Sequence, residues 1–133
     1  MAQTALIPQH HPRLAEARIA YLFAESLTRK GQEQLAKIKK AGALERYLGE
    51  VDYIMVVNYE TWQRLAKAQR RALLDHELCH CTVTSDKYGH PRYGLRGHDL
   101  EEFAEIVDRH GLWMPDVEEF AEVVQQQLPL RAA

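Results

Sequence analysis

Residues 72–81 read Ala72-Leu-Leu-Asp-His-Glu-Leu-Cys-His-Cys81, with two histidines four positions apart in an otherwise largely apolar stretch. Four residues make about one helical turn, so the imidazoles of His76 and His80 share one face of a helix and can bind one ion. Zinc accepts neutral imidazole nitrogens and, in catalytic sites, leaves its fourth position to water. Glu77 lies at the rim of that face, where its carboxylate can accept a proton instead of binding metal. The stretch therefore predicts a zinc site with Glu77 as general base.

A third ligand is expected downstream of this motif. His98 opens a predicted acidic helix, Gly97-His-Asp-Leu-Glu-Glu-Phe103, and a returning helix would direct its first residue toward the metal. Glu102 lies one turn further along the same face and is the alternative, which would give two histidines and one glutamate. Asp86 is a less favoured oxygen ligand. It occupies the last histidine position of the longer HExxHxxGxxH pattern, which this chain therefore lacks.

Other side chains near the motif are predicted to support it. Histidine ligands usually donate their second N–H to an oxygen, and Asp75 and Glu102 are the predicted acceptors. Cys79 and Cys81 are two positions apart on the predicted helix, so their side chains point to different sides and a disulfide between them is excluded. We expect both cysteines to be small buried hydrophobic residues.

The pattern of apolar residues predicts an α+β fold. The chain has 133 residues, of which 46% are apolar, so we expect one domain over residues 1–133. Helices are predicted at residues 12–28, 32–48 with a break at Gly42, 61–81, 99–110 and 116–128. The small sheet is predicted to have one strand before the motif helix, at residues 51–58, and a short hairpin after it, within residues 82–97.

The net charge of −2 hides an asymmetry. Residues 1–71 hold twelve Lys and Arg and seven Asp and Glu, a balance of +5, whereas residues 72–133 hold five and twelve, a balance of −7. The favoured interpretation of this charge asymmetry is that the two halves attract each other electrostatically within the fold. The less favoured alternative is a basic surface that binds an acidic partner such as nucleic acid. No stretch approaches the roughly 18 apolar residues of a membrane helix, and the two cysteines fit a reducing cytoplasm.

Four stretches carry a family resemblance: Val51-Asp-Tyr-Ile-Met-Val-Val57, Trp62, the motif at residues 72–80, and residues 97–103. On these stretches the chain resembles the putative phage metallopeptidases, small proteins of phages and prophages that are distantly similar to SprT-like zincins. The resemblance implies a minimal zincin fold in which helices pack around a small sheet. It also implies zinc held by His76, His80 and His98, Glu77 as the base, and the bacterial host cytoplasm as the location.

The expected function is hydrolysis of peptide bonds in a peptide or protein substrate. Zincins commonly bind an extended peptide against an edge strand, and the strand at residues 53–57 is the candidate. Asp99 follows His98 where SprT-like proteins typically have glycine, and the chain has too few cysteines for a zinc ribbon, so DNA-guided proteolysis is not implied. The alternatives are a non-catalytic zinc module that binds a host factor and a DNA-associated protease.

Overall fold

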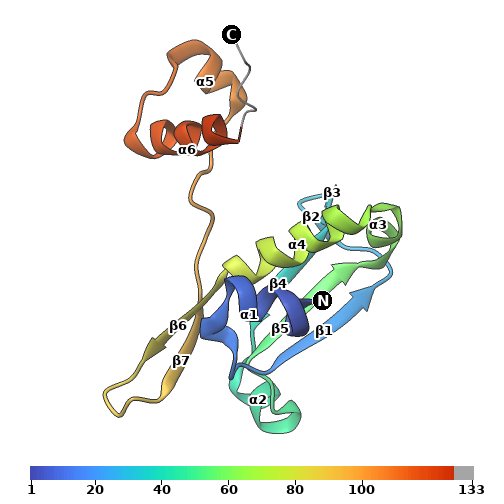
Figure 1. Ribbon diagram of the computed structural model, residues 1–133. Coiled ribbons are helices and arrows are strands. Elements are labelled where there is room, and N and C mark those ends of the chain that lie inside the picture. Colours follow the sequence, from blue (N-terminus) through green and yellow to red (C-terminus); the bar gives the residue numbers. More distant parts are fainter. Residues whose placement is uncertain (128–133) are drawn as a thin grey trace. The chain divides into compact units, whose positions relative to one another are not determined.

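The computed structural model describes residues 1–127 and divides the chain into two compact units (Figure 1). The first unit is Met1–Arg96, and the second begins at Gly97. Each unit is defined by the contacts among its own residues, and each is described by itself. One domain over residues 1–133 stays a prediction.

The first unit is built on a three-stranded sheet with the strand order β1-β5-β4 (Figure 1). The central strand β5 (Tyr53–Asn58) runs parallel to β1 (Ile19–Ala24) and antiparallel to β4 (Ala36–Lys40). Alternate residues of β5, namely Tyr53, Met55 and Val57, are buried in the core. One face of the sheet therefore carries the core. The strand predicted before the motif is confirmed.

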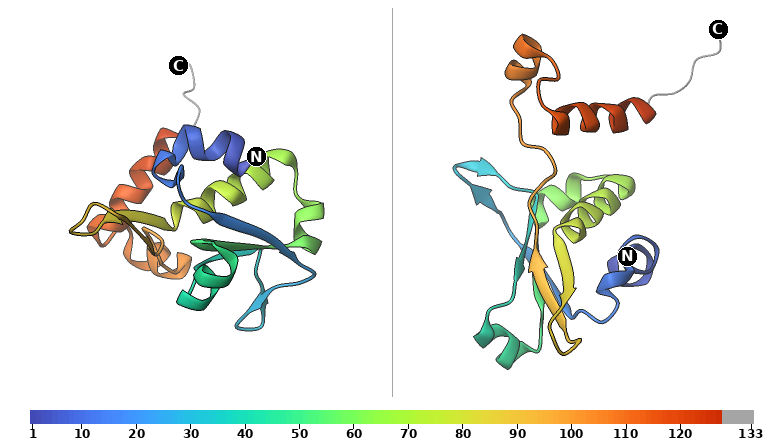
Figure 2. Two further views of the ribbon diagram at one scale, coloured as in Figure 1. Left: turned by 90° about the horizontal axis from the view of Figure 1, so that it is seen from below. Right: turned by 90° about the vertical axis from the view of Figure 1, so that its left-hand side faces the viewer.

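Two helices return along the core face of the sheet. The side chain of Asn58 caps α3 (Tyr59–Arg64) by accepting a hydrogen bond from the amide of Thr61 at 3.2 Å. After a short break, α4 (Lys67–Cys79) contributes Leu74 and Leu78 to the core. The right-hand view of Figure 2 shows α4 and the N-terminal segment on the same side of the sheet. That segment consists of η1 (Ala2–Leu6), α1 (Ile7–His10) and η2 (Pro12–Leu14).

A hairpin follows α4, as predicted. It pairs β6 (Cys81–Ser85) with β7 (Pro91–Leu95). The hydroxyl of Tyr53, in the central strand, lies 2.8 Å from the carbonyl oxygen of Thr82 and 2.9 Å from that of Gly94, and the two acceptors share its one hydrogen. A single buried hydroxyl thereby connects both hairpin strands to the sheet. It also helps to fix the position of the residues that follow β7.

The remaining elements are short. A small hairpin of β2 (Thr28–Arg29) and β3 (Gln32–Glu33) precedes β4, and α2 (Ala43–Gly49) connects β4 to β5. The second unit contains α5 (Ala104–His110) and α6 (Pro115–Gln126). Within residues 1–127, none of the helices combines the length and the hydropathy needed to cross a membrane.

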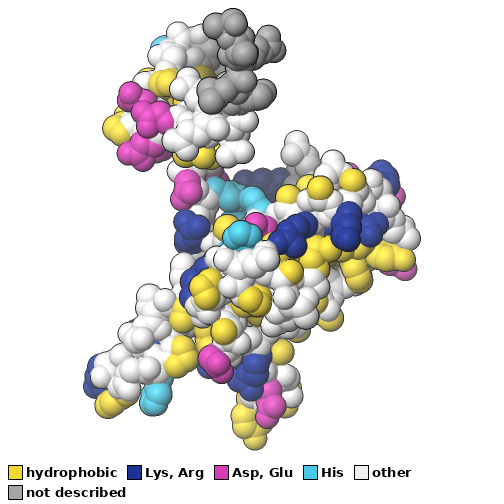
Figure 3. Space-filling model, viewed as in Figure 1, with side chains coloured by type: hydrophobic (Ala, Val, Ile, Leu, Met, Phe, Trp, Pro, Cys, Tyr) yellow, Lys and Arg dark blue, Asp and Glu magenta, His cyan; other side chains and the backbone are white. Residues whose placement is uncertain are grey.

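The two edges of the sheet differ in chemistry. At one edge, β1 exposes Phe23, whose ring meets those of Tyr59 and Trp62 edge-on at centroid distances of 5.2 and 5.9 Å. Figure 3 shows such exposed hydrophobic side chains next to Lys and Arg on one face of the first unit. At the other edge, β4 exposes Lys37 and Lys39. The sheet therefore has one apolar edge and one basic edge.

The helix predicted at residues 12–28 is wrong. Only the short η2 turn forms at its start, and β1 takes its centre. The residues Ile19-Ala-Tyr-Leu-Phe23 are apolar without interruption, so they satisfy a helical and a strand pattern equally well. Parallel pairing with β5, which is not visible in the local pattern, selects the strand.

The helix predicted at residues 32–48 is wrong over its first half, where β3 and β4 form. Burial alternates along β4: Ala36 is buried and Ile38 half-buried, whereas Lys37 and Lys39 are exposed. This strand period of two was hidden in the sequence by a Lys- and Ala-rich composition, which favours a helix. Only α2 remains helical. It begins directly after Gly42, the predicted break.

Three helix boundaries also differ from prediction. The segment at residues 61–81 forms two helices, and His80 is the C-terminal cap of α4. The helix predicted at residues 99–110 begins only at Ala104, so His98 does not open a helix and Glu102 is not one turn along it. The C-terminal helix is confirmed as α6, although the last predicted residue, Leu128, lies outside the described residues.

Candidate metal centre

The last turn of α4 brings the two motif histidines together. His76 and His80 each offer a ring nitrogen within 4.8 Å of the other, and their ring centroids are 5.2 Å apart with planes inclined by 77°. This is the arrangement expected from their spacing of four residues on one helix. The two imidazoles can therefore bind one ion.

The tautomer of His80 suits a metal ligand. Its Nδ1 lies 2.7 Å from the carbonyl oxygen of Arg96. A carbonyl oxygen only accepts hydrogen bonds, so Nδ1 carries the hydrogen and donates it, and the lone pair is on Nε2. Ligand histidines are usually oriented by such an oxygen. For His80 this oxygen belongs to the main chain and not to Asp75 or Glu102, the predicted acceptors.

Arg96 holds the end of α4 through further hydrogen bonds. Its amide donates to the carbonyl oxygen of His80 at 2.7 Å, and its Nε donates to that of Cys79 at 2.8 Å. The last carbonyls of a helix have no partner within the helix, and a cation there also interacts favourably with the helix dipole. No local sequence pattern indicates Arg96, because only the pairing of β6 with β7 returns it to α4.

Arg13 caps the same helix end from the N-terminal segment. Its Nη2 donates to the carbonyl oxygens of Leu78 and Cys81 at 3.0 and 2.9 Å, and its Nε donates to that of Cys81 at 3.1 Å. These bonds join residues more than sixty positions apart in the sequence. No local pattern indicates them, and Arg13 was also missed.

We expect Arg13→Ala to lower the free energy of unfolding by about 2 kcal/mol, because hydrogen bonds to charged groups contribute about 1.5–3 kcal/mol and these are partly exposed. Arg13→Lys should recover only part of the loss, since an ammonium group lacks the planar fork that reaches two carbonyls. Urea unfolding measures both changes. Equal stability of the alanine variant and the unchanged protein would contradict the capping role.

His11 links Arg13 to α4 through a carboxylate. Its Nδ1 lies 3.0 Å from Nη1 of Arg13, and its Nε2 lies 2.6 Å from Oδ1 of Asp75. A guanidinium only donates, so Nδ1 accepts and the hydrogen of the neutral ring is on Nε2, directed at Asp75. One donor atom each of His11, Asp75 and Cys79 lies within 4.8 Å of the others. Because both ring nitrogens of His11 are engaged, this group fits a support for α4 better than a second metal site.

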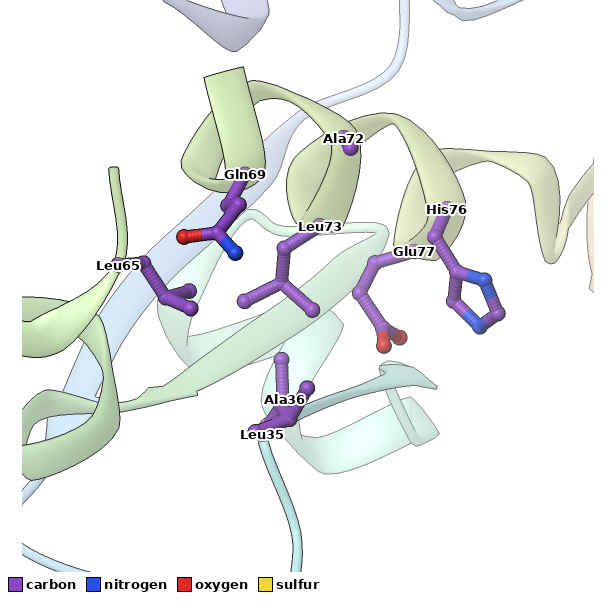
Figure 4. Close-up of a pocket in the computed structure, with 8 residues that line it drawn as sticks. All are labelled: Leu35, Ala36, Leu65, Gln69, Ala72, Leu73, His76 and Glu77. Atoms are coloured by element: carbon purple, nitrogen blue, oxygen red, sulfur yellow. The ribbon is translucent and has the colours of Figure 1, made fainter. Parts of the chain in front are cut away.

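Glu77 is buried, although a glutamate side chain in water is charged at neutral pH. Only 6% of its surface is exposed, and this burial raises the pKa of its carboxyl group, while the nearby His80 opposes the rise. Glu77 and His76 lie at one end of a cleft of about 500 Å³ (Figure 4). The other lining residues are Leu35, Ala36, Leu65, Gln69, Ala72 and Leu73. A buried carboxylate thus borders a cleft next to two potential metal ligands.

Two of the three candidates for a further ligand, Asp86 and Glu102, accept hydrogen bonds from nearby groups. Oδ1 of Asp86 accepts hydrogen bonds from the amides of Tyr88 and His90 and thereby organises the hairpin turn. In the second unit, the two carboxylate oxygens of Glu102 accept from the amide of Phe103 and, at 3.2 Å, from Nε1 of Trp113. Asp86 and Glu102 therefore each have hydrogen-bonding roles within their own unit.

The family model described as putative phage metallopeptidase matches residues 2–130, nearly the whole chain. The chain belongs to this family. No curated protein and no solved structure matches this phage metallopeptidase family member. A metallopeptidase family implies a metal ion, and the donor set fits one: two adjacent imidazoles, one of them oriented through its Nδ1 by the carbonyl oxygen of Arg96.

The two cysteines of this metallopeptidase family member differ in exposure. Cys81 is buried, and burial raises the pKa of its thiol to about 12, so it stays protonated and acts as a small hydrophobic residue, as predicted. Cys79 is exposed, and its predicted burial is wrong. It lies on the last turn of α4.

Proposed function

We propose that this protein is a zinc-dependent peptidase in which His76, His80 and His98 hold the ion and Glu77 acts as general base. The observation that carries the proposal is the buried carboxylate of Glu77 next to two helix-borne histidines at the end of a cleft. When bound, zinc lowers the pKa of a water molecule to about 7 and polarises a carbonyl group.

The protein's own contribution to the reaction is proton transfer by Glu77. Its burial disfavours the charged form, which makes the carboxylate a stronger base than one in water. Glu77 would accept a proton from the attacking water and then deliver it to the nitrogen of the leaving amine. The hydrolysis of a peptide bond then needs no covalent intermediate with the protein.

The support for His98 as third ligand comes from the course of the chain. Arg96 is fixed to the end of α4 by its main chain and its side chain, and His98 follows it by two residues. Two residues span at most about 7 Å, so the covalent chain keeps His98 near His80 whatever the course of the residues beyond it. Glu102 and Asp86 are less favoured, because their carboxylates already accept hydrogen bonds.

The substrate edge predicted at residues 53–57 is wrong, because β5 is central and has a partner on both sides. The edge next to the cleft is β4. The carbonyl oxygen of Leu35 accepts from the amide of Asn58, and the amide of Ala41 donates to the carbonyl oxygen of Asp52 across this pair. Along a strand of an antiparallel pair, residues hydrogen-bonded to the partner strand alternate with residues whose N–H and C=O groups point away from it. The N–H and C=O groups that point away from β5 therefore belong to Ala36, Ile38 and Lys40. We propose that an extended peptide pairs with these groups.

We expect zinc binding to weaken by more than tenfold as the pH falls from 7 to 5. Protons and zinc compete for the same imidazole lone pairs, so a lower pH favours the metal-free protein. Competition with a coloured chelator, measured at fixed ionic strength, gives the affinity at each pH. Unchanged affinity at pH 5 would contradict a site made of histidines.

The experiment that tests the proposal is the hydrolysis of quenched fluorescent peptides by the zinc-loaded protein, with Glu77→Gln as the matched variant. Hydrolysis that requires both zinc and Glu77 supports the proposal. Zinc binding without hydrolysis of any peptide in a broad library contradicts it and favours the non-catalytic alternative.

A further inference from the structure

We infer that the preferred substrate is an extended segment in which apolar side chains, directed toward α4, alternate with acidic side chains directed toward the opposite face of β4. This inference rests on the proposed peptidase function, because it concerns the peptide that would occupy the same cleft. It follows from three features of the first unit: the side-chain alternation of β4, the apolar lining of the cleft, and the lysines on the other face.

Side chains of β4 point alternately to the two faces of the sheet. Ala36 and Ile38 pack against the core on the face that carries α4, whereas Lys37 and Lys39 are exposed on the opposite face. Residues directly opposite one another in paired strands point to the same face. A peptide residue opposite Ala36 or Ile38 would therefore point toward α4, and its neighbours would point toward the lysine face.

The cleft that receives the first set of side chains is mainly apolar. Leu73, Ala72 and Leu65 line it from the helical side, and Leu35 and Ala36 line it from the start of β4 (Figure 4). The polar lining residues are Gln69, His76 and Glu77, of which His76 and Glu77 lie at one end. A cleft of about 500 Å³ has room for a large aliphatic or aromatic side chain next to the reacting bond.

The face that receives the second set is basic. The cross-strand neighbours of Lys37 and Lys39 are Val56 and Ile54, so β5 offers these lysines no carboxylate. Lys39 pairs instead with Oε2 of Glu45, which follows in α2, at 3.0 Å. A carboxylate on the added peptide would gain most from Lys37, whose charge is the less compensated of the two.

The test uses quenched fluorescent decapeptides that differ only in the alternating positions: leucine with glutamate, leucine with lysine, and alanine with glutamate. We expect kcat/KM to be about tenfold higher for the leucine–glutamate peptide than for the leucine–lysine peptide, because Lys37 attracts the glutamates and repels the lysines. Lys37→Glu should abolish or reverse this preference. Lys87→Glu makes the same charge change at the hairpin tip and should preserve it.

A second variant tests the apolar cleft. Ala72→Leu fills it from an exposed helix position, so it should lower kcat/KM for the leucine–glutamate peptide and have less effect on the alanine–glutamate peptide. Equal cleavage of all three peptides, or a charge preference that Lys37→Glu leaves unchanged, would overturn the inference while leaving the peptidase function intact.

Binding of the same peptides, measured by fluorescence anisotropy, separates the two proposals. If the zinc-loaded protein cleaves none of them but binds the leucine–glutamate peptide most tightly, in a manner that depends on Lys37, then the inferred peptide pattern holds for binding and the hydrolytic function fails. If it neither binds nor cleaves them selectively, the inference is overturned.

Discussion

Glu77→Gln is expected to lower kcat/KM for peptide hydrolysis by about 10²–10⁴-fold while leaving zinc binding unchanged. Glutamine matches the shape of glutamate but cannot accept a proton, and general base catalysis typically contributes a factor of this size. Glu77 is buried next to the histidines, so an isosteric replacement preserves the packing. Steady-state cleavage of quenched peptides measures the loss, and zinc content after dialysis measures the binding.

The matched control is Glu60→Gln, which removes the same charge from an exposed position in the first turn of α3. It should change neither property. If Glu77→Gln keeps full activity, another group acts as the base. If the unchanged protein and Glu77→Gln bind zinc and peptides equally well and neither hydrolyses them, the protein is a zinc-containing binding module.

Local sequence patterns predicted those parts of the molecule that depend on neighbouring residues. The helix with His76 and His80, the strand before it and the hairpin after it are all present. Each has a clear period or a turn signal of its own. The strands β1 and β4 were missed, because an uninterrupted apolar run and a lysine-rich run fit a helix as well, and only pairing with β5 decides between the two.

The supports of the site were beyond prediction for a related reason. Arg13 and Arg96 reach the end of α4 from positions 65 and 17 residues away along the chain, measured to Leu78 and Cys79. Asp75 was predicted as an acceptor for a metal-ligand imidazole, whereas the imidazole it contacts is that of His11. A spacing rule identifies groups on one helix face; it does not identify the partner that folding brings to them.

His80→Ala is expected to weaken zinc binding by more than the 10–100-fold typical of losing a residue that merely orients a ligand. Its Nδ1 is held by the carbonyl oxygen of Arg96, which orients the ring, so the substitution removes a pre-oriented donor. Competition with a chelator gives the affinity, and the absorption of the cobalt-substituted protein reports the donor set independently of activity. His90→Ala, at an exposed position in the hairpin turn, is the control and should bind zinc normally.

The same measurement distinguishes the candidates for the third ligand. His98→Ala should lower the affinity about as much as His80→Ala, whereas Glu102→Gln and Asp86→Asn should change it little, because these carboxylates hold Trp113 and the hairpin turn. A large loss in Glu102→Gln together with normal binding in His98→Ala would make the glutamate the ligand. The course of the chain favours the histidine, since Arg96 fixes the chain two residues before it and leaves it little room to move away.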